Sequence, residues 1–289
     1  MRILISGQHG QVSRELQRRL GSVGEVIVPG REQLDLLQPE KIRQQVRTIR
    51  PDLIINAAAY TAVDLAESEA DAAFAINARA PGIFAEEALA LDIPLIHYST
   101  DYVFDGTKVG AYTEDDLPNP LGVYGASKLA GERAITDVQG KHLILRTSWV
   151  YSTHGRNFLL TMQRLLQEKK ELRVVADQIG APTWAGTIAE NTLALIERWQ
   201  SGTSAWGSYH LTAQGQTSWF GFAQAIGETL REQGKPCAEL IPIPSSDYPT
   251  PAARPLNSCL DCSRLERDWG VSQPDWQMAL AECLIDQAK

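Results

Sequence analysis

The sequence predicts an α/β fold, a doubly wound parallel sheet followed by a smaller C-terminal α/β domain. In the first half, short β-branched or leucine-rich runs alternate with amphipathic stretches. A glycine-containing loop directly follows the first of these runs. The second half differs in texture, because prolines and tryptophans gather there. Alternating strands and helices are typical of a parallel sheet that helices cover on both faces.

The first half contains five expected buried strands, at residues 2–5, 25–28, 53–56, 95–99 and 143–147. Helices are expected between them, at residues 12–20, 39–49, 66–91 and 123–136. The helix over 39–49 begins with Pro39 and Glu40, which suit a first helical turn. Pro81 and Gly82 are expected to break the alanine-rich helix over 66–91.

The second half is expected to close over the carboxyl edge of the sheet, where open α/β sheets bind ligands. Helices are expected at residues 158–168, 187–199 and 220–233, and strands at 173–176, 209–212 and 239–243. The predicted first domain comprises residues 1–150, with about 178–213 returning to it. The predicted second domain comprises residues 151–177 and 214–289.

Composition excludes several classes of protein. The 289 residues include 27 basic and 35 acidic side chains, and the net charge of −8 argues against a nucleic-acid surface. No run approaches the ~20 apolar residues of a membrane span, and the run before Gly7 is too short for a signal peptide. Cysteines are few and late, and Cys259-x-x-Cys262 lacks the second pair that a zinc site needs. We therefore expect a cytoplasmic protein with no nucleic-acid or membrane partner.

The loop after the first expected strand has the pattern of a dinucleotide-binding turn, as in Rossmann-type folds. Gly7 permits the tight turn, and Gly10 lets the backbone approach a pyrophosphate at the helix N-terminus. Ser13 stands where a third glycine is usual, and the alternative is an ordinary strand–helix turn. The cofactor contacts expected here are Gly7, Gln8, His9, Gly10, Gln11 and Val12.

The end of the second expected strand bears on the choice of cofactor. NAD sites usually carry Asp or Glu there, whereas this chain offers Arg31, whose planar fork suits a 2′-phosphate. The alternative is a solvated surface arginine, since Glu32 follows it. We expect NADPH as the cofactor, with NADH as an accepted substitute. The remaining cofactor contacts expected near these strand ends are Asp35, Leu36, Ala57, Ala58, Ala59 and Tyr60.

Tyr124 and Lys128 are spaced i, i+4 and so share one face of an expected helix. A lysine cation one turn away is expected to stabilise the phenolate and to lower the tyrosine pKa from about 10. Thr100, at the end of the fourth strand, can donate to the same oxygen as Tyr124, and Ser99 beside it is an expected cofactor contact. The alternative is a tyrosine packed over a lysine stem.

These motifs resemble the extended short-chain dehydrogenase/reductase family, and within it the branch that reduces dTDP-4-dehydrorhamnose. The resemblance spans nearly the whole chain, and its late runs are specific to this branch. The matching runs are residues 10–12, 50–52, 56–64, 66–67, 99–106, 124–125, 128–132, 146–151, 177–178, 180–183, 248–252, 254–255 and 257–258.

The resemblance implies that NADPH reduces the C4 ketone of dTDP-4-dehydro-β-L-rhamnose to dTDP-β-L-rhamnose. It implies that Tyr124 donates the proton, that Thr100 stabilises the oxygen, and that Lys128 orients cofactor and tyrosine. It also implies an NADP-binding first domain and a second domain that binds the dTDP-sugar. The substrate contacts expected on this basis are Thr100, Asp101, Trp149, Asn157, Arg254 and Asn257.

Other functions in the family stay open. Sugar-nucleotide dehydratases of the family are similar at this strand end but carry Glu after the Thr-Asp pair, where this chain has Tyr102. An epimerase must retain NAD tightly, and Arg31 in place of an acidic residue is a poor fit to NAD. An NADP-binding regulatory subunit without turnover is the alternative from another class, because fold does not fix function. The intact Thr-Tyr-Lys set favours the enzyme.

The resemblance also bears on metal binding and assembly, since family members form dimers, some with Mg²⁺ between carboxylates. Glu15 matches one of these carboxylate positions, whereas Gly186 stands where a further carboxylate is expected. One carboxylate is a poor Mg²⁺ anchor without further oxygen ligands. We therefore expect no firm metal site, and a homodimer is the assembly that the resemblance implies.

Overall fold

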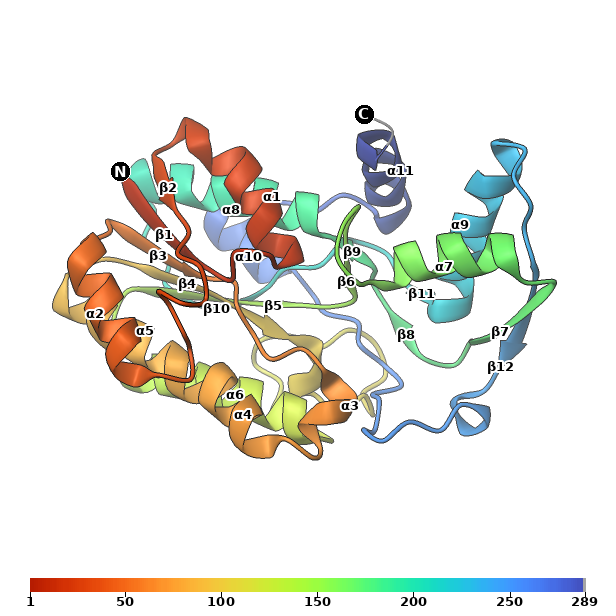
Figure 1. Cartoon of the computed structure of the whole chain (residues 1–289), viewed down its shortest axis with the longest axis horizontal. Helices are drawn as coiled ribbons and strands as arrows, with labels where there is room; N and C mark the ends of the chain where they lie inside the picture. Colours follow the sequence, from red (N-terminus) through yellow and green to blue (C-terminus); the bar gives the residue numbers. More distant parts are fainter. Residues whose placement is uncertain (288–289) are drawn as a thin grey trace.

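A computed structural model describes residues 1–287 of the chain (Figure 1). Its centre is a six-stranded sheet in the order β10-β5-β4-β3-β1-β2, in which every neighbouring pair is parallel. The strands are β1 (Arg2–Ser6), β2 (Glu25–Ile27), β3 (Leu53–Asn56), β4 (Leu95–Thr100), β5 (His142–Thr147) and β10 (Gly207–His210). The strand order reverses at β1, with β2 on one side and β3 on the other, which is the switch point of a doubly wound sheet. The predicted fold class is confirmed.

Helices cover both faces of this sheet, as Figure 1 shows. One face carries α1 (Gln11–Arg19) and α8 (Ala185–Gln200), and the other carries α2 (Pro39–Ile49), α5 (Ala80–Ala90) and α6 (Val123–Asp137). The period of two in a strand decides which residue enters which core. In β1, Ile3 and Ile5 pack on the α1 side, whereas Leu4 packs on the α2 side.

The alanine-rich segment expected over 66–91 is not one helix. It contains the end of α3 (Val63–Ala66), then α4 (Ala70–Phe74), a π-helical turn η2 (Ala75–Arg79) and α5. Pro81 does not end the helix, because residues 70–90 form one continuous helical run and Pro81 lies just after its π-helical turn. The irregular turn instead comes at η2, where the buried Asn77 amide donates to the Ser127 hydroxyl at 3.0 Å.

A second hydrophobic cluster lies beside the sheet and its helices. It joins α7 (Phe158–Glu168), α9 (Trp219–Glu232) and α11 (Trp276–Gln287), and next to them β7 (Glu171–Val175) pairs in parallel with β12 (Glu239–Ile243). Figure 1 places α7, α9, β7 and β12 together at one end of the molecule, with α11 between them and the large sheet. Shorter elements complete the chain: η1 (Leu20–Ser22), η3 (Asp101–Val103), β6 (Val150–Tyr151), β8 (Ile179–Gly180), β9 (Thr183–Trp184), β11 (Thr217–Ser218), η4 (Ser245–Asp247) and α10 (Ser263–Trp269).

The two cores do not divide the chain at simple boundaries. Residues 178–213 belong with the large sheet, because β10 is one of its strands and α8 covers one of its faces. Leu265 and Trp269 of α10 also pack into the core of that sheet, although they come late in the chain. The division into two domains stays a prediction. Among residues 1–287, no helix is both long and apolar enough to cross a membrane.

Candidate active site

A cavity of about 660 Å³ lies at the carboxyl ends of β1, β3, β4 and β5. The loops and strand ends that the sequence assigned to cofactor binding meet there. The predicted residues that line it are Gly7, Gln8, His9, Gly10, Gln11, Val12, Arg31, Asp35, Leu36, Ala57, Ala58, Ala59, Ser99, Tyr124 and Lys128. Tyr60 is not among its lining residues, and its hydroxyl donates to Glu69 at 2.6 Å.

The loop between β1 and α1 fits a dinucleotide pyrophosphate. Gly7 has a φ of +85°, and a Cβ there would lie 3.0 Å from the Ala58 Cα, so the loop needs glycine both for its conformation and for its close approach to the backbone. The Gly10 N–H donates to the Gly7 carbonyl at 2.9 Å and closes the turn. The first turn of α1 holds no acidic residue, and no side chain caps it. Its free N–H groups therefore suit an anion.

Opposite charges meet at the part of the cavity nearest β2. Arg31 and Asp35 both line it. Burial opposes ionisation of Asp35, but hydrogen bonds from the Leu37 N–H and the Gln38 amide outweigh it and lower the pKa of Asp35. Asp35 is therefore an anion at neutral pH, beside the cation that the sequence assigned to the 2′-phosphate.

Thr100 and Tyr124 lie together where β4 ends against α6. Burial raises the pKa of Tyr124 to about 12, although a hydrogen bond with the Thr100 hydroxyl lowers it. The expectation that a nearby lysine lowers this pKa is wrong for the structure described, because desolvation of the buried phenol dominates. A phenol that stays protonated at neutral pH is suited to donate a proton rather than to accept one.

Lys128, one turn beyond Tyr124 on α6, is buried, with a relative exposure of 2%. Its Nζ lies 2.6 Å from the Tyr98 carbonyl oxygen and 3.1 Å from Nε2 of His97. Burial lowers the pKa of Lys128 to about 8, although the Glu132 carboxylate opposes this shift. The sequence analysis missed His97. The signal that could have found it is its position as a polar residue inside an otherwise apolar strand.

Asp101 follows Thr100 and is almost fully buried. Burial raises the pKa of Asp101 to about 6, while hydrogen bonds from the hydroxyls of Ser258 and Thr100 lower it. The Thr100 hydroxyl donates to Asp101 Oδ1 at 3.0 Å and accepts the N–H of Tyr102 at 3.2 Å. Ser258 was not predicted as a site residue, although it belongs to the matching run 257–258.

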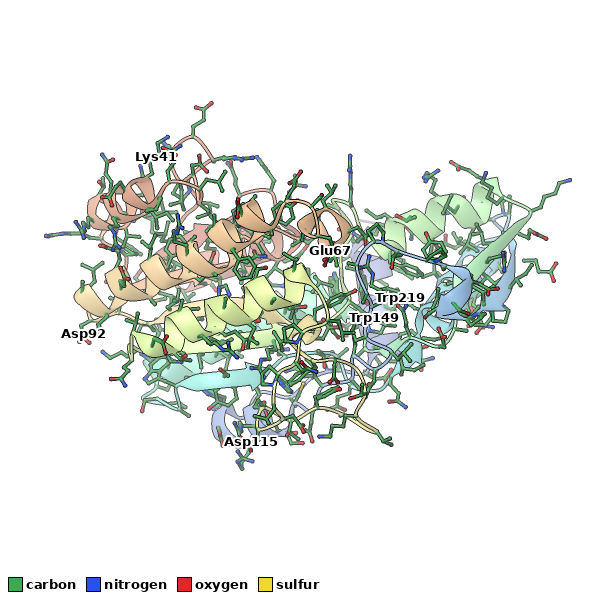
Figure 2. The ribbon with its side chains drawn as sticks, turned by 90° about the horizontal axis from the view of Figure 1, so that it is seen from below. Lys41, Glu67, Asp92, Asp115, Trp149 and Trp219 are labelled. Carbon is green, nitrogen blue, oxygen red and sulfur yellow. The ribbon has the colours of Figure 1, made fainter. Side chains whose placement is uncertain are left out.

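Trp149 stacks on Trp219, with ring centroids 3.6 Å apart and planes 9° apart. Figure 2 shows both labelled rings where the sheet-containing part of the molecule meets the smaller part. Trp149 also has a left-handed φ of 47°, which is uncommon outside glycine and costs on the order of 1 kcal/mol or more. The ring lies so close to Gly180 that a Cβ there would lie 2.6 Å from it. Sequence analysis did not predict the partner Trp219.

The other predicted substrate residues bind groups of their own chain. Asn157 caps the N-terminus of α7, where its side-chain oxygen accepts the Leu160 N–H. Its Nδ2 donates to Gln11 Oε1 at 2.9 Å, which connects α7 to the cofactor loop. Arg254 donates to both carboxylate oxygens of Asp64 at 2.9 Å. The Asn257 amide donates to the carbonyls of Lys108 and Gly110.

Glu15 is fully buried and is bound by arginines. Arg19 forms a tight ion pair with it and also reaches Glu190, while Arg18 lies 3.3 Å from its Oε2. A carboxylate already neutralised by two guanidinium groups has little left to offer a metal ion. Across residues 1–287, no group of three or more His, Cys, Asp or Glu side chains is arranged to hold a metal.

Arg156 is a further cavity residue that the sequence analysis missed. It follows Gly155, where a Cβ would lie 3.5 Å from Gln11 Cγ, so it stands near the start of α1. The signal was a glycine followed by a cation, but only the fold brings this segment to the cofactor loop.

The comparisons with known proteins decide the family. The family model described as the RmlD substrate binding domain matches residues 1–288. The chain belongs to this family. It is 46% identical over 295 residues to a dTDP-4-dehydrorhamnose reductase of Burkholderia thailandensis, covering 99% of each chain. It is 44% identical over 290 residues to the dTDP-4-dehydrorhamnose reductase of Escherichia coli K12, covering 98% of this chain and 97% of the relative.

A solved structure of an RmlD-family relative is also close to this one. The dTDP-4-dehydrorhamnose reductase of Bacillus anthracis, in complex with NADP, superposes with a TM-score of 0.92 at 36% identity, covering 99% of both chains. The resemblance stated from the sequence is confirmed, and so is the Rossmann-like fold.

Proposed function

We propose that this RmlD-family chain reduces the C4 ketone of dTDP-4-dehydro-β-L-rhamnose with NADPH, giving dTDP-β-L-rhamnose. The observation that carries the proposal is the convergence of three groups on one cavity. The glycine loop, the Tyr124–Lys128 pair of α6 and the end of β4 meet there. Relatives of nearly full length that carry the reductase name support the substrate class.

When bound, NADPH supplies the hydride for the ketone carbon. The groups of this chain act on the oxygen. Tyr124 holds a proton at its phenol and donates it to the oxygen as negative charge develops there. Thr100 donates a hydrogen bond to the same oxygen once its hydroxyl turns from Asp101. Lys128 holds a donor beside the cofactor site and can return a proton to Tyr124.

We place the cofactor at residues 1–150, joined by about 178–213, and the sugar nucleotide at residues 151–177 and 214–289. Gly7, Gly10 and Arg156 would hold the pyrophosphate, and Arg31 would hold the 2′-phosphate. Asp101 and Trp149 would contact the sugar nucleotide. We propose a cytoplasmic location and a homodimer as its assembly.

The test uses the purified chain with dTDP-4-dehydro-β-L-rhamnose and NADPH. We expect NADPH absorbance to fall while dTDP-β-L-rhamnose forms, and we expect Tyr124→Phe to stop both. Tyr209→Phe is the matched control, because that hydroxyl donates to Ala205 and lies outside the cavity. NADPH binding without oxidation in the presence of the ketosugar would instead support the regulatory-subunit alternative.

A further inference from the structure

A row of buried polar side chains leads from β1 through β3 and β4 to Lys128. The Ser6 hydroxyl lies 2.6 Å from Asn56 Oδ1, and Asn56 Nδ2 lies 3.0 Å from His97 Nδ1. His97 Nε2 then lies 3.1 Å from Lys128 Nζ. Each of these four residues is at most 2% exposed, so no member can satisfy its hydrogen bonds with bulk water.

The proton positions in this row depend on one another. The Ser6 oxygen accepts the Ala58 N–H at 3.1 Å, so its own proton goes to Asn56 Oδ1. Asn56 Nδ2 can then only donate, which makes Nδ1 of His97 the acceptor. A neutral imidazole carries one proton, and here that proton must be on Nε2, facing Lys128.

This arrangement suits Lys128 as a neutral amine, whose lone pair accepts the Nε2 proton while an N–H donates to the Tyr98 carbonyl. An ammonium has only donors. When Lys128 is protonated, Nε2 must accept, the imidazole proton must be on Nδ1, and Asn56 must turn its oxygen toward His97. Asn56 Nδ2 then donates to the Ser6 oxygen, and the proton of the Ser6 hydroxyl is left without an acceptor. His97 stays neutral in both states, because burial and the Lys128 charge hold the pKa of His97 well below its usual value.

We propose that Ser6, Asn56 and His97 form a positioning relay that couples the protonation of Lys128 to the tautomer of His97 and to the orientation of the Asn56 amide. None of the three was assigned a role above. The relay favours the neutral amine because only in that state does the proton of the buried Ser6 hydroxyl have an acceptor, Asn56 Oδ1. Its effect on turnover rests on the proposed function, whereas the coupling itself does not.

The other ionisable groups near Lys128 do not replace this coupling. Tyr124 lies one turn before it on α6, and burial keeps the phenol protonated. Glu132 lies one turn after it, but its carboxylate is bound by Arg146 of β5 at 2.6 Å. From β4, Lys128 contacts the neutral His97 and the Tyr98 carbonyl, and from β3 the uncharged Asn56 contacts His97.

The test follows the His97 tautomer in the full chain without cofactor or substrate. The protein is labelled with ¹⁵N-histidine, and long-range ¹H–¹⁵N NMR shows which ring nitrogen carries the proton as the pH is raised. The His97 signals are assigned by their loss in His97→Gln. We expect the proton to be on Nδ1 at low pH and on Nε2 at high pH, with a midpoint near the pKa of Lys128, about 8.

Two variants test the coupling. Lys128→Met removes the titrating group, and we expect a single His97 tautomer across the whole range. Ser6→Ala removes the preference for the neutral amine, and we expect the midpoint to rise by ~0.5–1 pH unit, the equivalent of one hydrogen bond. In the unmodified chain, a single His97 tautomer across the pH range or a His97 imidazolium near neutral pH would refute the relay. A tautomer switch of His97 that persists in Lys128→Met, or an unchanged midpoint in Ser6→Ala, would refute it as well. Since no substrate is present, failure of the proposed function would leave these outcomes unaffected.

Discussion

Arg31 is expected to give this chain its preference for NADPH. Arg31 is exposed and lines the cavity near the end of β2. One exposed charge-assisted contact with a 2′-phosphate contributes ~1–2 kcal/mol, and each ~1.4 kcal/mol is tenfold in affinity. We therefore expect kcat/KM for NADPH to exceed that for NADH by ~5–30-fold. Arg31→Ala should remove most of this ratio and leave NADH use nearly unchanged.

Two neighbouring side chains sharpen this prediction. Asp35 lines the same part of the cavity as an anion, so it should repel the 2′-phosphate, and Asp35→Asn should raise the preference for NADPH. Arg156 lies near the start of α1, so Arg156→Ala is a matched loss of one cation that should weaken both cofactors alike. The assay is kcat/KM for each cofactor in each variant. Equal use of NADH and NADPH by the unmodified chain, or a preference that survives Arg31→Ala, would show that Arg31 is only a surface charge.

Three further predictions concern the chemical end of the cavity. Tyr124→Phe should lower turnover by ~10²–10⁴-fold while NADPH still binds, and turnover within a factor of two would remove Tyr124 as the proton donor. Trp149→Ala should raise the substrate KM more than it lowers Tm, because the Trp149–Trp219 stack lies where the two parts of the molecule meet. A stability loss of ~3–5 kcal/mol with an unchanged KM would instead show that Trp149 is an aromatic residue of the hydrophobic core. The raised pKa of Asp101, about 6, means that this carboxyl contributes stability that is fully present below 3.8 and is lost as the pH rises through about 6. Asp101→Asn should therefore flatten the fall of Tm over that interval, and an unchanged slope would contradict the assignment.

Local signals in the sequence were enough for much of the fold and of the cofactor site. The helix Pro39–Ile49 and the strand Leu53–Asn56 match their predicted bounds, because a proline start and a β-branched run bounded by polar residues act over a few positions. The glycine loop was equally local, since its two glycines and the helix start lie within one turn of chain.

The residues missed by the sequence analysis depend on contacts between distant segments. Trp219 stacks on Trp149, and Ser258 forms a hydrogen bond with Asp101. The two residues of each pair are far apart in the sequence, so no local sequence pattern contains both. The pKa of Tyr124 was predicted in the wrong direction for a related reason. Spacing shows that Lys128 is one turn away, but it does not show how strongly the fold desolvates the phenol.

The substrate side was the least predictable part of the site. Arg254 was predicted to bind the diphosphate as a local cation. In the fold its guanidinium instead donates to both carboxylate oxygens of Asp64. Whether such a pair opens for a ligand depends on the energy of two charged groups in contact, which sequence spacing does not give.

The most direct test of the proposed reaction is the fate of a deuteride. The chain is incubated with dTDP-4-dehydro-β-L-rhamnose and NADPH deuterated at the transferable position, and the product is analysed by mass spectrometry and NMR. Reduction of the C4 ketone predicts dTDP-β-L-rhamnose with one deuterium, located at C4 of the sugar. A product without deuterium, a label at another carbon, or NADPH bound but never consumed would contradict the account.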